Sequence, residues 1–81
     1  MKRHEIEAKV REILVQQLEV SAEQLKPEAT IMVDLMADSL AIVELALALE
    51  QEFKLDEISD EDLDSLRTVG AVINYVQEKL S

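Results

Sequence analysis

The scarcity of chain-breaking residues limits what this chain can fold into. Its 81 residues include one glycine, Gly70, and one proline, Pro27. Because glycine and proline interrupt helices and form the tight turns of hairpins, their scarcity favours long helices joined by few loops. Only Phe53 and Tyr75 are aromatic, so the core of the fold must be mostly aliphatic. The length predicts one small domain over residues 1–81, and the composition predicts that it is all-α.

Four segments show the apolar spacing of amphipathic helices. The first ends at about Leu18, the second runs from about Ser39 to Phe53, and the fourth opens near Thr68. The third is short and begins after Ser59. We therefore expect a small four-helix bundle with three longer helices and a short third helix. The expected core positions are Ile6, Val10, Ile13, Leu14, Leu18, Ile42, Leu45, Ala46, Leu49, Phe53, Leu63, Leu66, Val69, Val72, Ile73, Val76 and Leu80.

A long loop separates the first two helices, from about Glu19 to Ala37. Apolar residues are scattered along it without a period, and Ser21 and Gln24 have the spacing of a capping box that predicts a single helical turn. Loops of this length within a compact domain are commonly functional. The loop therefore directs attention to Ser39, which follows it.

The charge is strongly acidic and unevenly distributed. Residues 1–11 carry four basic and two acidic groups, whereas residues 12–81 carry four basic and 16 acidic groups, and the net charge is −10. Such a surface repels nucleic acids and anionic membranes and favours basic patches on proteins. No segment approaches the roughly 18 apolar residues of a membrane span, and the start of the chain lacks the apolar segment of a secretory signal. We expect a cytoplasmic monomer with no nucleic-acid or membrane partner.

The residues of catalytic and metal sites are scarce. The chain has no cysteine, one histidine and no glycine-rich loop, so we expect neither an enzyme nor a metal site. Asp60, Asp62 and Asp64 have the first spacings of a calcium-binding loop, but Ser65 and Ala71 occupy positions that such a loop needs for glycine and glutamate. We interpret this acidic run as the solvated start of the third helix.

The second helix carries more apolar residues than its core face needs. At 100° per residue, Leu40, Val43 and Leu47 form a second stripe beside the core face, near Glu44 and Glu50. This pattern indicates docking to a partner that has a hydrophobic groove with a basic rim. In the alternative, the third helix or the long loop covers the stripe.

Several motifs together resemble the acyl carrier protein family. They are the stretch DLMADSL at residues 34–40, the segments VEL at 43–45 and LEQEF at 49–53, the acidic DED at 60–62 and TVG at 68–70. The resemblance covers most of the chain from Pro27 to Leu80. Met36 departs from it, because glycine is usual at that position, and such departures leave room for a specialised carrier with a narrower set of partners.

The resemblance implies that Ser39, flanked by Asp38 and Leu40, carries a 4′-phosphopantetheine arm that a phosphopantetheinyl transferase takes from coenzyme A. The thiol of the arm would hold acyl groups as thioesters and present them to enzymes of fatty acid, polyketide or related lipid biosynthesis. From the residues alone, Ser39 could instead be only a helix cap. The chain would then be an interaction module that docks through its apolar stripe without a prosthetic group. Positions matching the family's partner contacts are Asp38, Leu40, Val43, Glu44, Leu47, Glu50 and Glu52.

Overall fold

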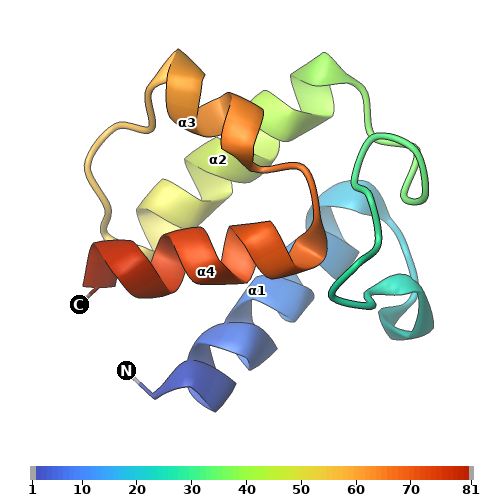
Figure 1. Ribbon diagram of the computed structural model, residues 1–81, viewed down its shortest axis with the longest axis horizontal. Helices are drawn as coiled ribbons and strands as arrows, with labels where there is room; N and C mark the ends of the chain where they lie inside the picture. Colours follow the sequence, from blue (N-terminus) through green and yellow to red (C-terminus); the bar gives the residue numbers. More distant parts are fainter. Residues whose placement is uncertain (1, 81) are drawn as a thin grey trace.

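The computed structural model describes residues 2–80, and it is all-helical apart from its loops. Its elements are α1 (Arg3–Leu18), the short 3₁₀ helix η1 (Ala22–Gln24), α2 (Ser39–Phe53), α3 (Asp60–Ser65) and α4 (Val69–Leu80). α1 packs against α2 and α4, while α2 also packs against α3 and α4, and Figure 1 shows α4 crossing over α1 with α3 at the edge of the bundle. The predicted four-helix bundle with a short third helix is confirmed, and α2 has the predicted ends.

The core is built from aliphatic side chains, as the composition predicted. The predicted faces of the helices are buried, and no polar or charged side chain is buried among residues 2–80. Leu18, Leu63 and Leu80 differ from the prediction, since they are only half-buried and pack at the edge of the core. Leu18 and Leu80 are the last residues of their helices, and Leu63 lies on the short helix α3. These positions have neighbours on fewer sides than the middle of a long helix.

The long loop is attached to the start of α4 by backbone hydrogen bonds. The N–H of Ile31 donates to the carbonyl of Arg67 at 2.8 Å, and the N–H of Val69 donates to the carbonyl of Ala29 at 3.1 Å. An isolated antiparallel bridge joins Thr30 to Thr68 between these bonds. The loop therefore has a defined path across the end of the bundle, with Ile31 fully buried.

The single glycine lies where two backbones approach closely. The N–H of Gly70 donates to the carbonyl of Pro27 at 2.9 Å, and a Cβ on Gly70 would lie 3.1 Å from that same oxygen. The left-handed backbone conformations fall instead on Glu19, Met36 and Lys54, whose φ angles are 55°, 57° and 54°. Side chains disfavour that conformation, so these three positions are strained.

Candidate functional site

The start of α2 leaves the hydroxyl group of Ser39 exposed. Asp38 caps the helix, because its carboxylate Oδ1 accepts a hydrogen bond from the N–H of Ala41 at 2.8 Å. Ser39 is the first residue within the helix, and its hydroxyl makes no hydrogen bond to any part of the chain that the structure describes. Asp38, and not Ser39, therefore caps the helix, and Ser39 is left available for another role.

The second apolar stripe of α2 faces solvent. Leu40, Val43 and Leu47 expose 66%, 42% and 52% of their surface. The alternative in which α3 or the loop covers the stripe is therefore wrong. Burying three such side chains against a partner would stabilise a complex, since each apolar side chain removed from water contributes about 1.5–3 kcal/mol when fully buried.

The acidic residues of α2 divide between two sides of the helix. Glu44 is exposed beside the stripe, and Glu50 is tied to the loop before α3, because its carboxylate accepts a hydrogen bond from the N–H of Ile58 at 2.7 Å. Glu52 points elsewhere. Nine residues after Val43, at 100° per residue, Glu52 lies on the opposite side of the helix. It pairs with Lys9 of α1 at 2.8 Å. The structure thus brings Glu44 and Glu50 to the stripe and leaves Glu52 between α1 and α2.

The loop adds exposed apolar residues, of which only Met36 was singled out in the sequence. Met36 exposes 85% of its surface only three residues before Ser39, and Met32 and Val33 are also exposed. An irregular loop has no period from which the outward direction of a side chain could be predicted. These residues extend the apolar surface around Ser39 beyond α2.

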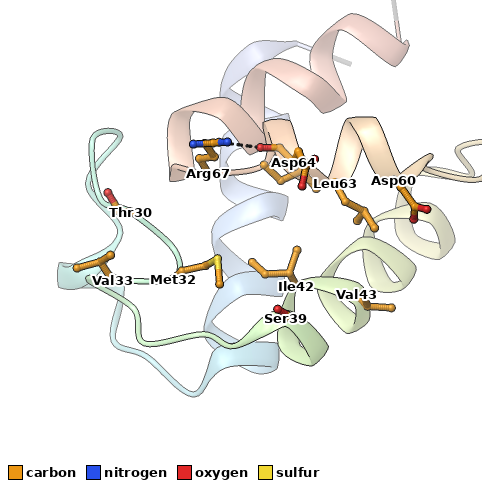
Figure 2. Close-up of a pocket in the computed structure, with 11 residues that line it drawn as sticks. Thr30, Met32, Val33, Ser39, Ile42, Val43, Asp60, Leu63, Asp64 and Arg67 are labelled. Atoms are coloured by element: carbon orange, nitrogen blue, oxygen red, sulfur yellow. Dashed lines mark hydrogen bonds between the residues drawn. The ribbon is translucent and has the colours of Figure 1, made fainter.

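A groove of about 600 Å³ opens beside Ser39, between α2, α3 and the loop (Figure 2). Its walls are mostly apolar, with Asp60, Asp64 and Arg67 as the charged residues. Figure 2 shows Ser39 and Arg67 on opposite edges of the groove, with Met32 and Ile42 between them. Arg67 could have been found in the sequence as the sole basic residue between Lys54 and Lys79. The lining residues are Thr30, Met32, Val33, Ser39, Ile42, Val43, Asp60, Leu63, Asp64, Leu66 and Arg67.

The geometry suits the attachment of a phosphate group better than catalysis. The first N–H groups of a helix and its dipole favour an anion bound at this end, although the carboxylate of Asp38 opposes it. Among residues 2–80 no base accepts the proton of the Ser39 hydroxyl, so a partner would have to activate it. Within the same residues no three metal-binding side chains converge, and none of the helices is long and apolar enough to span a bilayer.

Fold and site define a small helical domain that presents one serine hydroxyl next to an acidic, partly apolar docking helix. The family model described as the phosphopantetheine attachment site matches residues 8–76. The acyl carrier protein of Bdellovibrio bacteriovorus is 50% identical over 74 residues, which cover 91% of this chain and 94% of that protein. A solved structure of the acyl carrier protein from Enterococcus faecalis superposes with a TM-score of 0.80 at 39% identity, covering 98% of this chain and 99% of the other.

The chain belongs to the acyl carrier protein family. It carries acyl groups on a phosphopantetheine arm, and members of this family hand acyl chains to acyl-processing enzymes. The resemblance found in the sequence is confirmed. The alternative of an interaction module without a prosthetic group is therefore set aside.

Proposed function

We propose that Ser39 is the residue that holds the arm. The observation that supports this most strongly is its free, exposed hydroxyl at the first position of α2, beside a cap that does not need it. A transferase would remove the hydroxyl proton while the oxygen attacks coenzyme A. A phosphoester bond to Ser39 then forms, the phosphoanhydride bond breaks, and 3′,5′-ADP leaves. The bound arm supplies the thiol that carries the acyl group.

The exposed stripe Leu40, Val43 and Leu47 is the surface that we assign to partner enzymes. Glu44 lies beside it, and the net charge of −10 attracts partners whose binding sites are basic. Electrostatic attraction of this kind speeds association, while a small contact area permits rapid release. Both properties suit a carrier that visits several enzymes in turn.

The role of the remaining chain follows from this assignment. In this proposal residues 1–81 act as one non-enzymatic carrier domain that is monomeric and cytoplasmic. Its partners are a phosphopantetheinyl transferase and enzymes of fatty acid, polyketide or related lipid biosynthesis. Met36, in place of the usual glycine, adds an exposed side chain close to Ser39 and supports a specialised set of partners.

The docking surface is tested by the rate at which a phosphopantetheinyl transferase modifies the protein. Leu47→Ser and Glu44→Gln should each lower kcat/KM severalfold, since the first removes an apolar contact of the stripe and the second a charged contact beside it. Glu12→Gln on α1 is the matched control, because Glu12 is also exposed and acidic but lies on another helix. Equal rates for all three variants and the native protein would overturn the assignment of this surface.

A further inference from the structure

Among residues 2–80, Arg67 is the one cation that lines the groove beside Ser39, in a protein that is otherwise strongly acidic. It lies in the turn between α3 and α4 and reaches the groove from the edge opposite Ser39 (Figure 2). The groove volume of about 600 Å³ falls in the range of pockets that bind small molecules. An acyl chain on an arm that folds back from Ser39 would therefore meet Arg67 within the groove.

Two hydrogen bonds fix Arg67 and leave most of its donors free. Its backbone carbonyl accepts from the N–H of Ile31 at 2.8 Å, and its Nε donates to the carbonyl of Asp64 at 2.9 Å. A guanidinium group has five N–H donors, so four of them, on the two terminal nitrogens, remain. Both ion pairs found within residues 2–80 involve other residues. The unused donors can bind a group that enters the groove.

A plain alkyl chain would not match this environment. It would bury well against Ile42, Leu63 and Leu66, but it offers no acceptor to the guanidinium donors of Arg67, which is exposed and otherwise bonds to water. A chain with a carbonyl oxygen supplies that acceptor while its hydrocarbon part fills the apolar wall. Hydrogen bonds to a charged donor are among the stronger ones.

A negatively charged chain end fits less well than a neutral carbonyl. Asp60 and Asp64 line the same groove, so its charged residues sum to one net negative charge with Arg67 included. Like charges repel, and the net charge of −10 adds to this repulsion. The neutral carbonyl oxygen of a ketone accepts a hydrogen bond from Arg67 without that repulsion.

We propose that this groove holds a keto-substituted acyl chain and that Arg67 selects it by donating a hydrogen bond to the keto oxygen. The proposal rests on the attachment of the arm at Ser39. It adds to that assignment the chemical class of the cargo, and it makes Arg67 a specificity-determining residue that takes no part in attaching the arm.

The test compares acyl chains on the same protein. A broad-specificity transferase loads the native protein with eight-carbon acyl arms that are either saturated or carry one keto group at one of several positions. Intact mass confirms each loading before the melting temperature is measured. At least one keto chain should raise the melting temperature by about 4–8 °C above the saturated chain, the shift expected of one favourable hydrogen bond in a domain of this size.

Two variants test whether Arg67 causes that shift in melting temperature. Arg67→Met keeps the length of the side chain and should abolish the difference between keto and saturated chains, whereas Arg11→Met, an exposed arginine of α1, should preserve it. The proposal is overturned if no keto chain exceeds the saturated one, or if the difference survives in Arg67→Met. Should Arg67→Met not fold, Arg67→Leu, which also lacks a hydrogen-bond donor, is used, and an undiminished difference there counts against the proposal. Failure to load any chain would instead contradict the attachment at Ser39.

Discussion

The carboxylate of Asp38 accepts a hydrogen bond from the backbone N–H of Ala41 at 2.8 Å. Asp38 therefore caps α2, and the hydroxyl of Ser39 is not needed to stabilise the helix. An N-cap side chain is needed there because the first N–H groups of a helix have no partner within the helix. Since Asp38 meets that need, the neighbouring Ser39 can be modified without uncapping the helix.

Removal of the cap should therefore destabilise the protein, whereas removal of the Ser39 hydroxyl should not. We expect Asp38→Ala to lower the free energy of unfolding by about 1 kcal/mol, the usual cost of losing an N-cap side chain. Ser39→Ala should change it by less than about 0.5 kcal/mol, as surface substitutions commonly do. Denaturant unfolding measures both, with Asp38→Asn as a control that can still cap. Equal losses in the two alanine variants would contradict this division.

The left-handed conformation of Met36 predicts a stabilising substitution. Its φ is 57°, and its side chain is 85% exposed, so little packing is lost when it is removed. The strain costs roughly 1–2 kcal/mol, and glycine loses extra backbone entropy worth roughly 0.5–1 kcal/mol. Met36→Gly should therefore raise the free energy of unfolding by up to about 1.5 kcal/mol.

Met36→Ala is the matched control for that substitution, because alanine lacks the long side chain but keeps the Cβ that causes the strain. Its stability should stay close to that of the native protein. If the glycine variant were the less stable of the two, the conformation of Met36 would not be strained as described.

Tyr75 links α4 to α3 and makes the stability depend on alkaline pH. Its hydroxyl donates to a carboxylate oxygen of Asp62 at 3.1 Å. Burial, followed by this hydrogen bond, raises the pKa of Tyr75 from 10.0 to about 12. The folded state thus favours the protonated phenol. Its contribution is complete below pH 10.0 and is lost as the pH rises towards about 12. Between these values, the unfolding free energy of Tyr75→Phe should fall less steeply than that of the native protein, and parallel curves would contradict the link.

The net charge of −10 predicts that salt stabilises the fold. Raising the ionic strength from about 0.01 M to about 1 M shortens the Debye length from about 30 Å to about 3 Å and screens the repulsion between carboxylates. The same salt weakens the exposed pairs Arg3–Glu7 and Lys9–Glu52, but exposed pairs contribute little. The melting temperature should rise with sodium chloride, and with magnesium chloride at lower concentration. A flat or falling titration would show that self-repulsion is not significant.

The helices and the attachment region could be predicted from the sequence because their signals are local. α2 has both predicted ends, since the apolar period begins at Leu40, two residues after the Asp38 cap, and closes with Phe53. The DLMADSL stretch adds a family resemblance at the same place. The exposure of the stripe could not be decided, because it depends on where α3 and the loop lie, and periodicity carries no information on that.

Residues that depend on long-range contacts were missed or misplaced. Arg67 lines the same groove as Ser39, where backbone hydrogen bonds such as the one from the N–H of Ile31 tie the loop to the turn before α4, and no local pattern predicts them. Glu52 was grouped with the partner contacts by its match to the family. Helical spacing places it on the opposite side of α2 from Val43, and the structure pairs it with Lys9.

The central claim, that Ser39 carries the arm, is tested most directly by intact-mass measurement after incubation with coenzyme A, magnesium and a phosphopantetheinyl transferase. The native protein should gain the mass of one phosphopantetheine. Ser59→Ala, which removes the exposed serine that caps α3, should gain it too, whereas a folded Ser39→Ala should gain nothing. Modification of Ser39→Ala, or its absence from the folded native protein, would contradict the account.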